Sequence, residues 1–300
     1  MAFFKRHQGR GSYDLFSTYN YFMPGVSDLA WLVILFFVGV FLGILISAGL
    51  ALGISQDFAL TYGMVIVYPV QFIPAMLYAS AVSNRNMGFE PEYPLDNSNF
   101  GGRSGLSMAL IVSVMALAAA FVIEPVSMLL PEMSEATKLA MEQMLKGPVW
   151  IVLLSVSVFA PFFEEWLCRG IILRGLLKKM KPGWAIVISA LVFGLIHMNL
   201  WQAIPAFIIG TILGYVYYKT GSLKLTMLMH CVNNTFALLI SRIPALADAE
   251  TFMDILCPWK YTCIYIASVL FLLSTIVILA GIPKKEGARS GCDEIPPLEI

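Results

Sequence analysis

Two adjacent carboxylates and a guanidinium group interrupt an apolar stretch of this sequence. Glu164, Glu165 and Arg169 follow the hydrophobic run 149–163, which is most of the length of a membrane span. Ionisable groups inside a span are costly and are usually functional. In a helix of about 3.6 residues per turn, Arg169 shares a face with Glu165, whereas Glu164 points about 100° away. The spacing therefore predicts a structural Glu165–Arg169 pair and leaves Glu164 as the candidate chemical group.

Two later hydrophobic segments carry the other candidate residues. His197 ends the segment FGLIH, in which Phe193 lies on the same helical face. His230 begins the segment HCVNN, in which Asn234 lies on the same face and Asn233 is an alternative partner. The remaining histidine of the chain lies in the polar N-terminal region. Both histidines of the apolar segments are therefore candidates for the same site as the glutamate pair.

A carboxylate, two imidazoles and a carboxamide in a pocket of low dielectric can hydrolyse an amide bond. Glu164 can act as a general base on a water molecule, and His197 can hold the same water. His230 and Asn234 can then donate to the oxyanion that forms on the attacked carbonyl.

A metal site is the alternative interpretation of the same residues. Glu164, His197 and His230 could hold an ion such as Zn²⁺ with one position open for water. The sequence lacks the HExxH motif of common zinc proteases, and no cofactor is firmly implied. Because an asparagine near the second histidine suits an oxyanion role better than a ligand role, the glutamate–water interpretation is favoured.

The composition of the chain places these residues in a membrane protein. Hydrophobic residues make up 59% of the chain and charged residues 13%, whereas soluble domains average about 25% charged residues. The formal net charge of zero gives no basis for nucleic-acid binding. Five cysteines without CxxC spacing predict neither a disulfide framework nor a cysteine-type zinc site. The polar, aromatic first 28 residues do not resemble a cleavable signal peptide.

Eight apolar segments predict an all-α polytopic membrane protein with about eight transmembrane helices. The predicted spans are 29–54, 60–82, 105–130, 149–180, 184–198, 201–218, 223–240 and 261–282. Most are near the roughly 20 residues that cross a bilayer, and the fifth is short. The three motifs fall on spans four, five and seven. Residues 131–147 are predicted to form an amphipathic helix at the membrane interface.

The distribution of basic residues predicts the orientation of these spans. With the N-terminus inside, 15 of the 19 Lys and Arg residues lie on the inner side, so both termini are expected in the cytoplasm. The expected organisation is an N-terminal tail (1–28), a transmembrane domain (29–282) with its motif-bearing core at 149–241, and a C-terminal tail (283–300). At about 1.5 Å per residue, Glu164, His197 and His230 lie roughly 16, 20 and 11 Å from the inner ends of their spans. A shared site is therefore geometrically feasible.

Together, the three motifs resemble the signature of the CPBP (Abi, CAAX-protease and bacteriocin-processing) intramembrane endopeptidases. That family includes the eukaryotic prenyl-protein CaaX endopeptidase. EExxxR begins at Glu164, FxxxH at Phe193 and HxxxN at His230, in this order and on three different spans. Each motif alone is weak, but the ordered trio is specific. The first 148 residues carry no motif of the family.

The resemblance implies a role for each motif residue. Glu164 would be the general base, and His197 would position the water. His230 and Asn234 would stabilise the oxyanion. Glu165, Arg169, Phe193 and Asn233 would be supporting residues. The resemblance leaves open whether a metal is used.

The resemblance also implies an environment and a class of substrate. We expect an integral, multi-pass protein of a bacterial cytoplasmic membrane that cleaves a peptide or protein substrate, with prenylation of that substrate left open. The lipid bilayer is the other expected partner. A catalytically silent immunity or scaffold protein of the same fold is the main alternative. An ion- or proton-coupled transporter ranks last because the sequence shows no internal repeat of the kind that such transporters carry.

Overall fold

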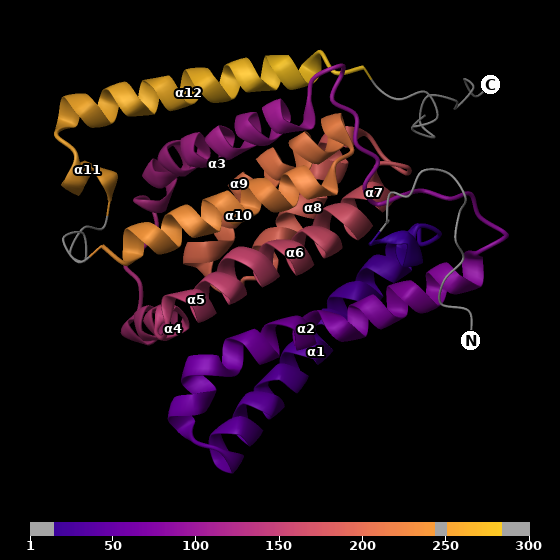
Figure 1. Ribbon diagram of the computed structural model, residues 1–300, viewed down its shortest axis with the longest axis horizontal. Helices are drawn as coiled ribbons and strands as arrows, with labels where there is room; N and C mark the ends of the chain where they lie inside the picture. Colours follow the sequence, from indigo (N-terminus) through magenta and orange to yellow (C-terminus); the bar gives the residue numbers. More distant parts are fainter. Residues whose placement is uncertain (1–14, 244–250, 284–300) are drawn as a thin grey trace.

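The computed structural model describes residues 15–243 and 251–283 as a bundle of helices (Figure 1). Residues 1–14 and 284–300, which belong to the two predicted tails, lie outside the described residues. Within these ranges, seven helices are long and apolar enough to cross a membrane, and a shorter apolar helix accompanies them. No β-strand occurs in the described ranges. The predicted all-α, multi-pass membrane architecture is therefore confirmed, and about eight spans are compatible with it.

The helices begin and end close to the predicted spans. The long ones are α1 (Val26–Gly53), α2 (Gln56–Asn86), α3 (Gly105–Ser127), span four (Val149–Leu176), α9 (Leu200–Thr220), α10 (Leu223–Ser241) and α12 (Pro258–Ala280). The shorter ones are η1 (Ser17–Tyr19), α4 (Glu135–Leu145), α8 (Pro182–Leu195) and α11 (Phe252–Ile255). Side chains of Ser55, Ser104, Asn199 and Ser222 cap the N-termini of α2, α3, α9 and α10, which explains why these helices start there.

Span four is a composite helix with two widened turns. It runs through α5 (Val149–Val152), the π-helical η2 (Leu153–Phe159), α6 (Ala160–Glu165), the π-helical η3 (Trp166–Leu173) and α7 (Arg174–Leu176). The widened geometry is visible in the Ala160 N–H, which donates to Ser155 O, five residues earlier. Such turns are rare and often occur at functional sites. Here they flank the short segment that carries both glutamates.

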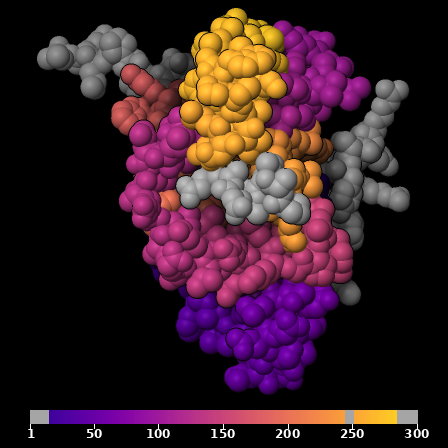
Figure 2. Space-filling model, turned by 90° about the vertical axis from the view of Figure 1, so that its left-hand side faces the viewer, coloured from indigo at the N-terminus to yellow at the C-terminus, as the bar shows by residue number. Residues whose placement is uncertain are grey.

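Span four also lies at the centre of the bundle. In its most apolar window 61% of the residues are buried, compared with 22% in α1 and 17% in α2. Figure 1 shows it passing between α10 and the hairpin formed by α1 and α2. In Figure 2 that hairpin forms a separate lobe at the edge of the molecule. Span four and the α1–α2 hairpin therefore differ in how much of their surface the rest of the protein covers.

The start of α1 and the end of α12 lie at the same end of the bundle. The loop between α2 and α3 makes hydrogen bonds to four other parts of the chain: the segment before α1, the last turn of span four, the turn between α9 and α10, and the segment after α12. The pairs are Tyr93–Asn20, Tyr93–Arg174, Asn97–Gly221 and Asn99–Pro283. A chain that starts and finishes at the same end crosses an even number of times. Counting α8 as a crossing agrees with the predicted eight spans, while the cytoplasmic side stays a prediction.

Candidate active site

Glu164 lies in α6, near the middle of span four, with only 5% of its surface exposed. Its Oε1 accepts a hydrogen bond from the Tyr68 hydroxyl of α2. Its Oε2 has no hydrogen-bond partner among the described residues, and Nε2 of His230 lies 3.7 Å from it. One oxygen of the carboxylate is therefore held, and the other is free to accept a hydrogen bond.

The predicted pair of Glu165 and Arg169 is present and completely buried. Nη1 of Arg169 lies 2.7 Å from Oε1 of Glu165, and neither side chain has any exposed surface. Nη2 of Arg169 donates to Gly210 O at 2.9 Å. A Cβ at Gly210 would come within 2.9 Å of the Phe193 ring and 3.2 Å of the guanidinium group. Glycine at this position therefore lets α9 approach closely enough for Gly210 O to accept a hydrogen bond from Nη2 of Arg169.

His230 joins the two glutamates. Its Nδ1 lies 3.0 Å from Oε1 of Glu165, which as a carboxylate can only accept, so Nδ1 carries the shared hydrogen. This contact turns Nε2 toward the free oxygen of Glu164. The spacing in the sequence predicted Arg169 as the partner of Glu165 but did not reveal the bond to His230. Arg169, Glu165, His230 and Glu164 thus form one continuous buried chain.

His197 lies in the turn after α8 rather than on the fifth span where the sequence places it. The helix ends earlier because Asn199 caps α9, and its side-chain amide also donates to His197 O at 3.1 Å. The next residue, Met198, has a φ of 56°, which is uncommon outside glycine. Nδ1 of His197 lies 2.8 Å from Phe193 O, which can only accept, so Nε2 is left as the free nitrogen. The imidazole is therefore held in one tautomer when neutral.

Phe193 separates the two histidines. Its buried ring makes edge contacts with His197 at 5.2 Å and with His230 at 5.4 Å between ring centres. The Arg169 guanidinium lies 4.4 Å from the centre of the same ring. Within the described residues, no ion pair joins His197 to a carboxylate. The structure thus brings Glu164, Glu165, Arg169, Phe193 and His230 together, and it connects His197 to them only through the aromatic ring.

The side chain of Asn234 is hydrogen-bonded to a backbone carbonyl of span four that lacks its usual donor. Pro161 has no N–H, so it cannot donate to Val156 O in the i to i−5 pattern of η2. The side-chain amide of Asn234 donates to that carbonyl at 2.9 Å. Asn233 in turn donates to Oδ1 of Asn234 at 3.2 Å. One amide hydrogen of Asn234 is therefore used for positioning, and the second remains for another acceptor.

Tyr68 contacts Glu164, and the residue spacing in the sequence did not predict this contact. It lies on α2, which the sequence marked only as an apolar span, and 96 positions separate it from Glu164. A tyrosine inside an apolar span gives no local signal of such a partner. Only the packing of α2 against span four brings the two side chains together.

The three predicted metal ligands do not converge. Among the described side chains, no group of three His, Cys, Asp or Glu residues is close enough to hold an ion. Glu164 and His230 approach each other, but His197 stays apart from both. The arrangement does not fit the zinc alternative.

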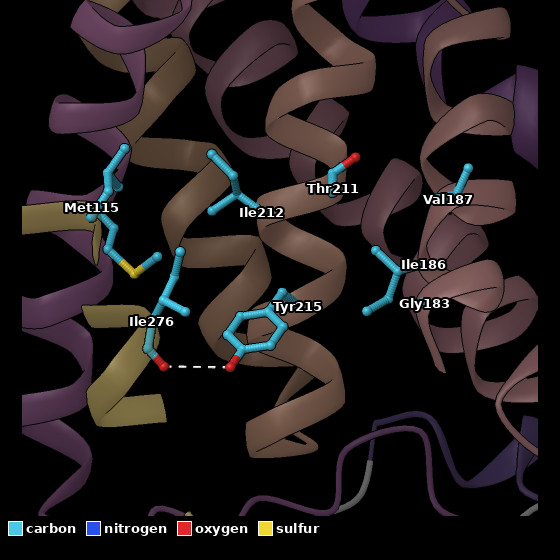
Figure 3. A pocket seen from close by; sticks show the side chains of 9 residues that line it. Met115, Gly183, Ile186, Val187, Thr211, Ile212, Tyr215 and Ile276 are labelled. Carbon is cyan, nitrogen blue, oxygen red and sulfur yellow. Dashed lines mark hydrogen bonds between the residues drawn. The ribbon is translucent and has the colours of Figure 1, made fainter. Parts of the chain in front are cut away.

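An apolar pocket lies elsewhere in the bundle. It has a volume of about 370 Å³ and lies between α3, α8, α9 and α12 (Figure 3). Met115, Ile186, Ile212 and Ile276 line it, and none of the candidate residues does. Its one polar contact in the figure, from the Tyr215 hydroxyl to Ile276 O at 3.3 Å, joins two of its own walls. The pocket therefore has no part in the candidate site.

Comparison with known proteins points to one family. A family model described as "Type II CAAX prenyl endopeptidase Rce1-like" matches residues 146–236, a segment that contains all three motifs. A curated relative of Bacillus subtilis (strain 168), named "Putative membrane peptidase YdiL", is 26% identical over 111 residues. That match covers 37% of this chain and 45% of the relative, so the chain spans less than half of that protein. No solved structure matches the chain.

The matched segment, the order of the motifs and the multi-pass helical architecture all agree. Residues 146–236 are thus similar to the CAAX prenyl endopeptidases, and the curated relative is also named as a membrane peptidase.

Proposed function

We propose that this protein is an intramembrane endopeptidase that hydrolyses a peptide bond with a water molecule activated by Glu164. The observation that carries the proposal is the environment of this carboxylate. Oε1 is held by Tyr68, and the buried Oε2, opposite His230, has no hydrogen-bond partner in the part of the chain that the structure describes. A buried polar atom without a partner costs free energy unless water or a ligand satisfies it. A reacting water is the simplest group that meets this requirement.

The reaction begins with a proton transfer to Oε2 of Glu164. As that oxygen takes a proton from water, the water oxygen attacks the carbonyl carbon of the scissile bond, and the π electrons of the carbonyl move to its oxygen. Nε2 of His230 and the second amide hydrogen of Asn234 donate to the resulting oxyanion. When the carbonyl re-forms, the C–N bond breaks and Glu164 returns its proton to the leaving amine. The products are a carboxylic acid and an amine.

The charges around His230 support its part in this scheme. Two carboxylates, Glu164 and Glu165, share the buried cluster with the guanidinium of Arg169. Nδ1 of His230 faces Glu165, so Nε2 is the nitrogen that faces Glu164 and the proposed substrate. In the proposed scheme, Nε2 is the atom that donates a hydrogen bond to the oxyanion.

His197 is proposed to hold the attacking water from the other side. Its Nδ1 hydrogen is committed to Phe193 O, so Nε2 can accept a hydrogen bond from water. This role requires the water or the substrate to bridge the space between His197 and Glu164. No step uses a metal ion.

The proposed substrate is a peptide or protein with a hydrophobic or lipidated end, cleaved near the cytoplasmic face. The description of the matching family model, a CAAX prenyl endopeptidase, supports this class. The inner half of the membrane is proposed because the basic residues predict the inner side, and the predicted span ends put the motif residues between that side and the midplane. The alternative is a silent immunity or scaffold protein that binds a partner with the same fold.

The test compares new peptide termini across the proteome of the host. Cells express wild type, Glu164→Gln or Glu135→Gln at matched levels in the membrane; Glu135 is an exposed carboxylate of α4 and serves as the control. The proposal predicts termini that depend on wild type and on Glu135→Gln but are absent with Glu164→Gln. Identical termini in all three strains would favour the scaffold alternative.

A further inference from the structure

We propose that Tyr68 is a positioning residue for Glu164, so that the α1–α2 hairpin completes the active site. The helix that carries Tyr68, α2, lies outside residues 146–236, the segment that the family model matches. The inference rests on the proposed function, because it assigns Tyr68 the task of orienting the proposed base.

The contact between the two side chains is specific. The Tyr68 hydroxyl donates to Oε1 of Glu164. Within the described residues it makes the one hydrogen bond that this carboxylate receives, since Oε2 has none. A buried carboxylate with a single donor depends on that donor for its orientation.

A second pair of side chains docks the same helix. Phe72, one turn after Tyr68, is completely buried and stacks on Phe163 with ring centres 5.3 Å apart and an interplanar angle of 18°. Phe163 directly precedes Glu164. Two successive turns of α2 therefore contact two successive residues of α6. The placement of Tyr68 does not depend on its own hydrogen bond alone.

The hydrogen bond has a direct consequence for the geometry of the base. The terminal torsion of a glutamate side chain is broad and roughly two-fold, so a free carboxylate can exchange its two oxygens. With Oε1 held by Tyr68, Oε2 stays directed toward Nε2 of His230 at 3.7 Å. Loss of the hydroxyl would leave the carboxylate free to turn away from the water. Small misplacements of reacting groups are costly in rate.

The expected effect of Tyr68→Phe is therefore on turnover. Removing one hydrogen bond to a charged group should lower kcat by about 10- to 100-fold. KM should stay within about twofold, because Tyr68 orients Glu164 and is not assigned any contact with the substrate. A residue that only supports the fold would instead lower the amount of folded protein.

Tyr78→Phe is a closely matched control. Tyr78 lies on the same helix, and its hydroxyl donates to Oδ1 of Asp28 at 2.6 Å. The control thus removes a hydrogen bond between a tyrosine and a carboxylate inside the hairpin and leaves Glu164 untouched. Its kcat should remain within about twofold of wild type, because no catalytic group is involved.

The experiment uses the full-length protein in lipid nanodiscs and a synthetic peptide that spans a cleavage site found only with wild type. It compares wild type, Tyr68→Phe, Tyr78→Phe and Glu164→Gln by kcat, KM and thermal unfolding. A selective loss of kcat in Tyr68→Phe supports the inference. Wild-type kcat in Tyr68→Phe, or an equal loss in Tyr78→Phe, would overturn it. Cleavage by Glu164→Gln would instead contradict the proposed function.

An infrared measurement tests the same contact without a substrate. The carboxylate stretching band of Glu164, obtained as the difference between wild type and Glu164→Gln, should shift in Tyr68→Phe and stay unchanged in Tyr78→Phe. If Tyr68→Phe does not fold, 3-fluorotyrosine at position 68 keeps the ring and the hydroxyl but makes a stronger donor, and it should also shift the band. An unchanged band would overturn the inference.

Discussion

The motif-bearing helices and the α1–α2 hairpin meet the same bilayer in opposite ways. Span four holds Glu164, Glu165 and Arg169, and 61% of its most apolar window is buried. The corresponding window of α1 is more apolar, yet only 22% of it is buried, and side chains such as Leu45 are exposed. In lipid an exposed apolar side chain costs little, whereas an ionised one must be shielded. Between span four and α1, burial therefore follows the charged residues rather than hydrophobicity.

One side of α2 in the hairpin nevertheless contacts the core. Tyr68 reaches Glu164, and Phe72 stacks beside it on Phe163. The opposite side of α2 is exposed, as at Leu77. The contrast between the two regions thus runs through a single helix. Substitutions at the buried charges, at the candidate site and on the lipid-facing surface test this contrast separately.

The largest effect is expected from removal of the buried cation. Arg169→Met would leave the Glu165 carboxylate without its cationic partner in a fully buried site, which should lower the free energy of unfolding by about 3–5 kcal/mol. Lys138→Met is the control, because its pair with Glu135 is exposed and should contribute at most about 1 kcal/mol. Denaturant titration of both purified variants measures the difference. Equal losses of unfolding free energy in the two variants would show that the buried charges are not the reason why span four is buried.

An effect of similar size, but confined to activity, is expected at His197. His197→Ala should reduce cleavage by about 10²–10⁴-fold because the water loses one of its two proposed acceptors. The unfolding temperature should change little, since the side chain is only half-buried. Met198→Ala, at the exposed neighbouring position, is the control. Normal peptide cleavage by His197→Ala would leave Glu164 as the sole residue that handles the water.

The two neighbouring asparagines allow a test within α10. Asn234→Ala should reduce cleavage by about 10²–10³-fold, as expected when one oxyanion donor is lost. Asn233→Ala removes only a donor to Asn234 Oδ1 and should cost less than about tenfold. Steady-state rates with the same peptide give both values. The reverse order would assign the oxyanion contact to Asn233.

The smallest effect is expected on the lipid-facing side of the hairpin. Leu77 is 66% exposed, so Leu77→Ala should change the free energy of unfolding by no more than about 0.5 kcal/mol and leave cleavage unchanged. Measurements in nanodiscs of constant lipid composition keep the environment fixed. A loss of activity in this variant would mean that the exposed side of α2 also takes part in the reaction.

Local periodicity predicted what lies within one helix. The apolar runs predicted the spans to within a few residues, and the spacing of Glu165 and Arg169 predicted their pair. It also placed Phe193 and His197 on one face, where the imidazole bonds to the Phe193 carbonyl. These features depend on helix geometry alone, so they can be derived from residue spacing.

Residue spacing within a helix did not predict the contacts between helices. The bond from His230 to Glu165 spans 65 positions, and the bond from Tyr68 to Glu164 spans 96. Both depend on how helices pack, which spacing within one segment does not specify. The end of α8 before His197 was also missed, because it depends on the capping side chain of Asn199 in the next helix.

The most direct test of the account compares the two adjacent glutamates. Glu164→Gln and Glu165→Gln make the same change in size and charge at neighbouring positions, and both variants are assayed as purified protein with one peptide. If Glu164 is the base, its variant folds with an unchanged unfolding temperature and cleaves no faster than buffer alone. Glu165→Gln should unfold at a lower temperature, because Arg169 loses its anionic partner. Cleavage by Glu164→Gln at the wild-type rate would contradict the central claim that this carboxylate activates the water.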